Sequence, residues 1–497
     1  MTTEELLAAA RNLVHLHGRF APLFGRAEPR NHSRIYICGL IQNRGRKSVE
    51  RMALDGAHLA GEPKSQAKVL AMQGFLTDSP WSQSEVQREI QAVFVERLVP
   101  STSQWSVGSV GVIDESGFVK HGEHSVGVAR QHCGRMGKVE NCQVGVFLVG
   151  VTPAGSALLD HQLYLPQEWF EVERPQPKRA PKSKTNRPQP PPKLTPEQRL
   201  AREQQLQARR SKARIPTTVK FATKPQLAAT LIARCTVPLN WITADDLYGR
   251  NQAFLEALEG RKQRYVVEVP GFTRVWIEAP ERCQGPGAAG RRPSKSIEHE
   301  FIQRLDDLAK SLPPEAWKIL TLREGSKGPL AFKFARIRVW AVRDRKAGPP
   351  IWAMIQQSLG PKPTTRYWVS NASEETRLEA LAEVAGCRWR VEETFQDAKT
   401  HLGMADYEAR AWTSWHHHMS LVALAHLYVT LTRQEQRESE PTLTLDMAIL
   451  MLEASLPRPT LNEEEAAELI KYHVERNKAA HQSHRKTWLE NHPEVPS

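Results

Sequence analysis

One short stretch of the chain carries charged residues at spacings that suit phosphodiester chemistry. Arg388, Glu392 and Lys399 are separated by four and then seven residues, so on a helix all three share one face. A carboxylate between two cations can hold a metal ion while the cations bind phosphate oxygens. A surface helix with ordinary ion pairs has the same pattern, and for an isolated helix that interpretation is the more common one. The rest of the chain must therefore decide between the two.

Two further carboxylates are expected where buried strands end. The apolar run Val107–Ile113 predicts a strand, and Asp114 follows it. Leu239–Ala244 predicts another strand, which Asp245 and Asp246 follow. Ligands of open α/β sheets bind beyond the carboxyl ends of strands. Asp114 and one of the two later aspartates are therefore candidate ligands.

One carboxylate from each of these places makes a set that suits two-metal chemistry. Asp114, Asp245 (or its neighbour) and Glu392 can bind two Mg²⁺ ions about 4 Å apart, and Mn²⁺ can substitute. One ion would activate water or a 3′-hydroxyl, and the other would stabilise the leaving oxygen. Such a site catalyses in-line attack on a phosphodiester. Two aspartates after strands are a weak signal, but three acids in this order, with cations flanking the glutamate, are fairly specific.

The elements that must position these acids can be predicted in outline. Good helix propensity predicts one helix over about 379–402, with Val391 and Phe395 in an apolar stripe that anchors it on a core. Neighbouring residues of a strand alternate between its two sides, so Glu115 should point away from Asp114.

The net charge of the chain indicates a polyanionic partner. Lys and Arg number 68 against 55 Asp and Glu among 497 residues, a net charge of +13, and nucleic acid is the most common partner of such proteins. The candidate contacts are a turn with Arg46 and Lys47 before a helix start, a Gly-rich run over 127–138 with Arg130 and Lys138, and a Pro-rich basic insert over 174–193. The turn with Arg46 and Lys47 is typical of a helix-turn-helix, but also of any two helices joined by a turn. The Gly-rich run over 127–138 suits a phosphate-binding loop or a plain hairpin. The third suits a segment that contacts nucleic acid or a solubilising linker.

Several classes of protein are disfavoured by the cysteines, histidines and apolar runs. The six cysteines are scattered without a Cys-x-x-Cys pair, which argues against a zinc ribbon or a disulfide framework and suits a reducing cytoplasm. The longest apolar runs are shorter than a membrane span. His416, His417 and His418 cannot all face one metal on a helix, so we expect no zinc site but a DNA contact by one or two of them.

The chain is too long for one core, and we expect several regions. They are a helical N-terminal DNA-binding domain (1–100), the first part of a catalytic domain (101–270, with the disordered insert 174–193), a β-rich insertion (271–370), the rest of the catalytic domain with the glutamate helix (371–435), and a helical basic C-terminal region (436–497). Most of the tryptophans in the insertion are expected to fill a β core, although aromatic and basic residues together also suit stacking on distorted DNA.

At this point the chain resembles a known family, the DDE transposases of bacterial insertion sequences. The stretches that carry the resemblance are Gly111–Gly117, Gly127–Gln131, Asn141–Gln143, Leu163–Pro166, Ala244–Gly249 and Arg388–Glu392. The resemblance spans roughly residues 30–430. It implies an α/β, ribonuclease-H-like mixed sheet with a helical N-terminal domain and a mostly β insertion before the catalytic glutamate.

The resemblance also implies roles for individual residues. Asp114, Asp245 and Glu392 would be the catalytic residues and the Mg²⁺ ligands. Asp245 is preferred to Asp246 because the aspartate of the family precedes x-x-Tyr-Gly, as Asp245 does.

One transposase group carries the signature Tyr-x-x-Arg-x-x-x-Glu-x-x-x-x-x-x-Lys. Arg388, Glu392 and Lys399 match it, but Ala385 stands where that group has tyrosine. The departure puts the phosphate contact of that tyrosine in doubt, while the metal ligands are unaffected.

The implied activity is that of a DNA transposase. It would bind terminal inverted repeats, cleave the element ends and join 3′-hydroxyls to target DNA, with a homodimer in the synaptic complex and a cytoplasmic, nucleoid-associated location. The expected DNA and phosphate contacts are Arg388, Lys399, Arg130, Lys138, Arg46 and Lys47. The alternatives are a domesticated, transposition-inactive DNA-binding or regulatory protein, or a plain ribonuclease-H-fold nuclease; the presence of all three acids weighs against the first.

Overall fold

The computed structural model describes most of the chain. The described residues are 3–42, 45–59, 65–171, 195–278, 301–325, 328–343, 346–437, 440, 442–456 and 462–491. The Pro-rich insert 174–193 lies outside them. The chain divides into two compact units, one of 1–86, 398–409 and 413–497, the other of 87–397 and 410–412. Within the described ranges, no helix is both long enough and apolar enough to cross a membrane.

The first unit is built from helices that come from both ends of the chain. Its helices are α1 (Thr3–Phe20), α2 (Ala27–Ile41), α3 (Val49–Leu59), α4 (Gln66–Thr77), most of α15 (Trp412–Glu435), α16 (Leu445–Ser455) and α17 (Glu463–Asn491). Two further helices, α5 (Gln83–Arg97) and α14 (Arg388–His401), cross the division between the units. The helical character expected of the N-terminal residues is confirmed over their described part.

Helix α15 is the buried centre of this unit. Its three consecutive histidines are between 0% and 3% exposed. The two ring nitrogens of His417 lie 2.9 Å and 3.1 Å from the carbonyl oxygens of Leu76 and Trp81. The expectation that one or two of these histidines contact DNA is therefore wrong, because their rings are enclosed in the helical core.

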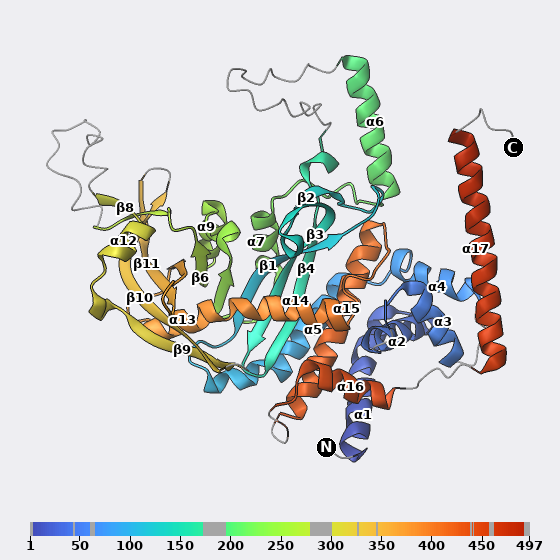
Figure 1. Cartoon of the computed structure of the whole chain (residues 1–497), viewed down its shortest axis with the longest axis horizontal. Coiled ribbons are helices and arrows are strands. Elements are labelled where there is room, and N and C mark those ends of the chain that lie inside the picture. The colour runs from blue at the N-terminus through green and yellow to red at the C-terminus, as the bar shows by residue number, and fades with distance from the viewer. Residues whose placement is uncertain are drawn as a thin grey trace. The chain divides into compact units, whose positions relative to one another are not determined.

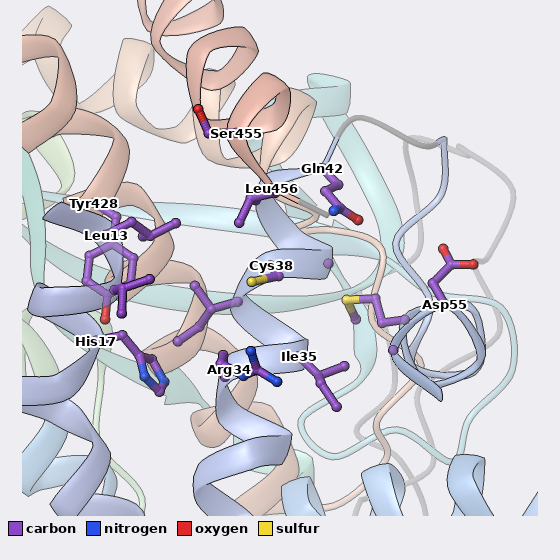
Figure 2. Close-up of a pocket in the computed structure, with 15 residues that line it drawn as sticks. Leu13, His17, Arg34, Ile35, Cys38, Gln42, Asp55, Tyr428, Ser455 and Leu456 are labelled. Atoms are coloured by element: carbon purple, nitrogen blue, oxygen red, sulfur yellow. The ribbon is translucent and has the colours of Figure 1, made fainter. Parts of the chain in front are cut away.

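The same unit contains a hollow of about 260 Å³. Its lining is mostly apolar and includes Leu13, Ile35, Cys38 and Tyr428 (Figure 2). None of the candidate acids is among the described residues that line it. The chemistry predicted from the sequence must be sought in the other unit.

In the second unit, the described residues form one mixed sheet of twelve strands, around which the unit is organised (Figure 1). The strands are β1 (Val110–Val119), β2 (Ala129–Cys133), β3 (Lys138–Thr152), β4 (Gly155–Tyr164), β5 (Trp241–Ala244), β6 (Arg264–Val269), β7 (Arg274–Trp276), β8 (Ile302–Arg304), β9 (Lys318–Gly325), β10 (Gly328–Arg343), β11 (Lys346–Ser358) and β12 (Thr365–Ser370). The helices are α6 (Pro196–Lys212), α7 (Lys224–Arg234), α8 (Asp246–Gly249), α9 (Gln252–Gly260), α12 (Leu305–Ser311), α13 (Leu378–Gly386) and the parts of α5 and α14 that belong here.

The strand order confirms the expected ribonuclease-H-like fold. Strands β4, β3, β1, β5 and β6 lie side by side in that order. Neighbours are antiparallel from β4 to β1 and parallel from β1 through β5 to β6. From β6 the sheet continues through β12, β11 and β10, so the strands of the expected insertion extend the catalytic sheet instead of forming a separate one.

Strand β1 is longer than predicted and passes through Asp114 instead of ending there. Its parallel pairing with β5 nevertheless stops at Ile113 and Ala244. Beyond that point, the partner of β1 among the described strands is the antiparallel β3, which pairs with it up to Val119. Asp114 therefore lies at the end of the parallel ladder although it lies inside a strand.

Two other local predictions are corrected. The Gly-rich run over 127–138 contains strand β2, which forms a hairpin with β3, as the plain hairpin alternative required. The single helix expected over 379–402 is two helices, α13 and α14, with a break at Cys387. The residue before the break is Gly386, and glycine has a low helix propensity.

Helices cover both faces of the sheet. Arg234 of α7 binds Asp160 of β4, with Nε–Oδ2 and Nη2–Oδ1 distances of 2.5 Å and 2.8 Å. Phe395 of α14 packs on Phe147 of β3 with ring centroids 5.2 Å apart. Asp160 is paired with Leu148, the neighbour of Phe147, so the two helices lie on opposite faces. Figure 1 shows α14 lying across the strands.

The expectation that most tryptophans of the insertion strands fill a core holds for two of the four described there, whereas Trp340 and Trp352 are half-buried. Trp276 and Trp368 are buried. Trp352 donates from its indole nitrogen to the carbonyl of Ser373 at 3.0 Å, with the Arg336 guanidinium over its ring.

The ion pair between α7 and the sheet yields a stability prediction. Arg234→Met should lower the free energy of unfolding by about 3 kcal/mol, because it leaves the buried Asp160 carboxylate without its counterion. Urea unfolding would measure the change. Arg199→Met is the matched control, because Arg199 forms an exposed pair with Glu203 at 3.4 Å and should cost less than about 0.5 kcal/mol. Equal losses in the two variants would contradict the prediction.

Candidate active site

The two predicted aspartates meet where the parallel ladder ends. Because Ile113 is paired with Ala244, the next residues of the two chain segments, Asp114 and Asp245, emerge side by side. One carboxylate oxygen from each lies within 4.8 Å of the other, and an oxygen of Glu115 completes the group. Strand register thus brings together two acids that are far apart in the sequence.

Glu115 is the unexpected member of this group. Its backbone is opposite Val146, on the face of the sheet that α7 covers, whereas Asp114 is opposite Phe147, on the α14 face. The alternation therefore holds for the backbone, but the expected separation of the carboxylates is wrong. The parallel pairing of β1 with β5 has stopped at Ile113, and the Glu115 carboxylate comes within 4.8 Å of the aspartates.

Two donors hold the Glu115 carboxylate. Lys224, the first residue of α7, places its ammonium nitrogen 2.8 Å from Oε1. The Tyr248 hydroxyl donates to Oε2 at 2.9 Å. Both oxygens of Glu115 are thereby fixed in position.

The Asp-x-x-Tyr-Gly motif has a physical explanation in the turn after β5. Asp245 caps the short helix α8, accepting a hydrogen bond from the Leu247 amide at 3.0 Å. The turn places the buried Tyr248 against Glu115. A Cβ on Gly249 would lie 1.9 Å from the carbonyl oxygen of Glu268 on β6, so only glycine fits. Each named position of the motif therefore has a steric or hydrogen-bonding requirement.

Asp246, the alternative ligand from the sequence, points elsewhere. Its Oδ2 pairs with Nη2 of Arg250 at 2.6 Å, and its side chain is 42% exposed. The choice of Asp245 from the motif agrees with this geometry.

Helix α14 brings Arg388 into the acidic group. Its guanidinium nitrogens lie 3.4 Å from Asp114, 3.5 Å from Glu268 and 3.0 Å from Glu392. The Arg388 side chain is only 15% exposed, whereas Glu392 is 63% exposed. The Arg388 guanidinium is therefore paired with carboxylates of the site, and it connects Glu392 to Asp114.

The carboxylates perturb one another. Burial raises the pKa of Asp114 to about 8; the Arg388 charge opposes this shift, and Asp245 and Glu115 add to it. Burial and the Glu115 charge raise the pKa of Asp245 to about 6, again against Arg388. Burial, followed by Glu115, raises the pKa of Tyr248 well above its ordinary value, so its hydroxyl remains a donor. The site has more negative charge than its own cations neutralise, which favours a bound cation.

The residues predicted to contact phosphate differ in their exposure, and Lys47 is too buried to contact DNA. Its side chain is 5% exposed, and its ammonium donates to the carbonyls of Leu40 and His401. A cation used in this way has no freedom to bind DNA, so the sequence-based expectation is corrected.

Of the remaining candidates, Arg388 is largely enclosed in the acidic group, Lys399 is half-buried, and the other three are exposed. Arg46 pairs with Glu408 at 3.0 Å and is 65% exposed. Arg130 is exposed on β2, and Lys138, at the start of β3, is 60% exposed and pairs with Glu140. Lys399 lies near the end of α14. Their contact with DNA stays a prediction.

Sequence reasoning missed several residues of the site. Lys224 was not among the predicted site residues, and Tyr248 was noted only as part of a motif. Glu268 lies on β6 and pairs with both Arg388 and, at 3.8 Å, Arg366. The available signal was an isolated acid in the otherwise apolar strand segment Tyr265–Val269.

Comparison with known proteins identifies the class to which this fold and site belong. The family model described as "DDE superfamily endonuclease" matches residues 19–329. The match covers more than half of the chain, and the chain belongs to this family.

The individual proteins found to be similar to this chain have low sequence identity to it. A curated relative, "Probable transposase for insertion sequence element IS701" from Microchaete diplosiphon, is 23% identical over 337 residues, which is 67% of each chain. A cryo-EM structure of a piggyBac transposase synaptic complex with hairpin DNA aligns with 10% identity and a TM-score of 0.32, covering 88% of this chain and 78% of that one.

The raised pKa of Asp114 predicts a pH-dependent stability change. In the metal-free folded protein the carboxyl keeps its proton up to about pH 8, whereas its ordinary value is 3.8. The protonated Asp114 carboxyl therefore contributes to the free energy of unfolding. This contribution is fully present below pH 3.8, the ordinary pKa, and is lost as the pH rises towards 8. Asp114→Asn cannot ionise, so its advantage over the wild type should grow with pH to roughly 1–3 kcal/mol.

Thermal unfolding in a chelator between about pH 5 and about pH 8 would measure this advantage. Asp246→Asn serves as the control, since its carboxylate is exposed and paired with Arg250. A constant difference between Asp114→Asn and wild type across that range would count against the prediction.

The close approach at Gly249 generates a second prediction for this site. Gly249→Ala should destabilise the protein by about 1–3 kcal/mol and displace Asp245, because the added carbon meets backbone that cannot move aside easily. Gly260→Ala, at the end of α9, is the matched control, with nothing within 4 Å of the added carbon. Chemical unfolding of both variants would test it, and equal stabilities would show that the turn can relax.

Proposed function

We propose that this protein is an insertion-sequence transposase. It would bind terminal inverted repeats, cleave the element ends and join the 3′-hydroxyls to target DNA. The observation that carries the proposal is the meeting of Asp114 and Asp245 at the end of the parallel ladder in a chain of the DDE endonuclease family. The transposase named among its relatives supports the choice of reaction.

The donor set suits a hard divalent cation. Oxygens of Asp114, Glu115 and Asp245 lie within 4.8 Å of one another, and carboxylate oxygens are the ligands that Mg²⁺ and Mn²⁺ prefer. Asp114 and Asp245 would hold the metal, with Glu392 as the third ligand of the proposal. Such ions, when bound, activate the attacking hydroxyl and stabilise the leaving oxygen of the phosphodiester.

The residues of the chain itself would prepare this site for the reaction. Asp114 and Asp245 must lose their protons before they can serve as ligands, which couples metal binding to pH. Arg388 contacts both Asp114 and Glu392 through its guanidinium. Further along the same helix, Lys399 would contact a phosphate near the scissile bond.

DNA is the proposed partner, in agreement with the net charge of +13. Arg46, Arg130 and Lys138 are the proposed backbone contacts. Two element ends must be cut together, so we propose a homodimer in the synaptic complex. The proposed location is the bacterial cytoplasm, at the nucleoid.

The proposal predicts separate losses of cutting and binding. Asp114→Ala, Asp245→Ala and Glu392→Gln should each reduce metal-dependent cleavage of labelled element-end DNA by at least about 1,000-fold. DNA binding in a mobility-shift assay should persist, because the phosphate contacts are made elsewhere. Glu393→Gln is the control, a neighbouring acid on α14 that pairs with Arg390 at 3.3 Å, and it should still cut.

The outcomes separate the candidate functions. Cutting by Asp114→Ala would refute the assignment of the site. Wild-type binding without cutting, in Mg²⁺ and in Mn²⁺, would favour a regulatory protein that has lost transposition. Cutting without joining of 3′-ends would favour a plain nuclease.

A further inference from the structure

Glu115 occupies a position in the site that neither the proposed catalytic set nor the family match explains. Its carboxylate joins those of Asp114 and Asp245 within 4.8 Å. It reaches them from the face of the sheet opposite Asp114, at the point where β5 has ended. A surface carboxylate would instead turn outward, away from the repulsion of two neighbouring acids.

The orientation of Glu115 is imposed by two separate elements. Lys224 begins α7 and binds Oε1 at 2.8 Å, and its side chain is 20% exposed. Tyr248 is fully buried in the turn after β5 and donates to Oε2 at 2.9 Å. Both partners are donors, so both stabilise the ionised carboxylate. The contacts with Lys224 and Tyr248 therefore offset the free energy needed to keep a third carboxylate beside the two aspartates.

We propose that Glu115 is a positioning residue of the metal site, where it acts as a fixed negative charge that strengthens cation binding by Asp114 and Asp245. Lys224 and Tyr248 hold it in place. The proposal rests on the proposed function, because it assumes that the two aspartates bind a divalent cation. Charge beside the ligands raises cation affinity, and groups that support ligands typically change metal affinity by about 10–100-fold when removed.

A purely structural role is the competing explanation. In that case the contacts of Glu115 would only fasten α7 and the turn after β5 to β1. Removal of the charge would then destabilise the metal-free protein without a specific effect on the cation. Metal-free stability and cation affinity must therefore be measured separately.

The first experiment is a calorimetric titration of the full-length protein with Mn²⁺, without DNA. Glu115→Gln keeps the shape of the side chain and removes its charge, and it should bind Mn²⁺ about 10-fold more weakly. Its metal-free melting temperature should stay close to that of the wild type, because the loss of the Lys224 ion pair is offset by the removal of a negative charge beside Asp245. Asp246→Asn removes a charge adjacent to Asp245, but that charge is exposed and paired with Arg250, so affinity should stay within about twofold.

A double-mutant cycle tests the route through Tyr248. Tyr248→Phe removes only the hydroxyl that holds Oε2, and it should weaken Mn²⁺ binding less than Glu115→Gln does. The double variant should bind no more weakly than Glu115→Gln alone, because the hydroxyl acts through that carboxylate.

The other possible results contradict either the role proposed for Glu115 or the proposed function. Wild-type Mn²⁺ affinity in Glu115→Gln would overturn the proposal. A lower metal-free melting temperature in that variant, with unchanged affinity in its folded fraction, would assign Glu115 to structure and also overturn it. A wild-type protein that binds no Mn²⁺ would instead contradict the proposed function on which the proposal rests.

Discussion

The site depends on negative charge concentrated at one point of the sheet. Ionised carboxylates within 4.8 Å of each other repel by roughly 3–4 kcal/mol per pair at an effective dielectric constant of about 20. The fold offsets this repulsion by placing Arg388 on the Asp114 side and Lys224 on the Glu115 side. Burial, more than this repulsion, raises the pKa of Asp114 to about 8, and a bound divalent cation would favour the ionised carboxylate again.

The sheet explains why the charge gathers at that point. Strand β5 ends one residue before Asp245, so β1 loses its parallel neighbour at Asp114. The gap lets side chains from both faces approach each other, while α14 and α7 supply cations from opposite faces. The turn after Asp245 packs against β6 at Gly249, where a Cβ would lie 1.9 Å from the carbonyl oxygen of Glu268. The register of β1, the length of β5 and the turn at Gly249 together gather the negative charge at one point of the sheet.

Local sequence predicted much of this arrangement. The apolar runs indicated the strands, and the aspartates after them indicated candidate ligands, because hydrophobic pattern is a local signal. The spacing of Arg388 and Glu392 indicated their shared helix face, and they pair at 3.0 Å. The class of fold and the family followed from these motifs. The extent of β1 could not be predicted, because it is decided by pairing with β3, far along the chain.

The sequence by itself determined which residue types were available for the chemistry and on which elements they lie. Tertiary structure alone decided which of them meet. Glu115 joins the site where a neighbouring strand stops. Lys47, a predicted DNA contact, is instead buried, and its ammonium donates to carbonyls inside a helical core. Both outcomes depend on burial and on partners distant in sequence. Such contacts leave no periodic signal in the chain, since they arise only when separate segments pack together.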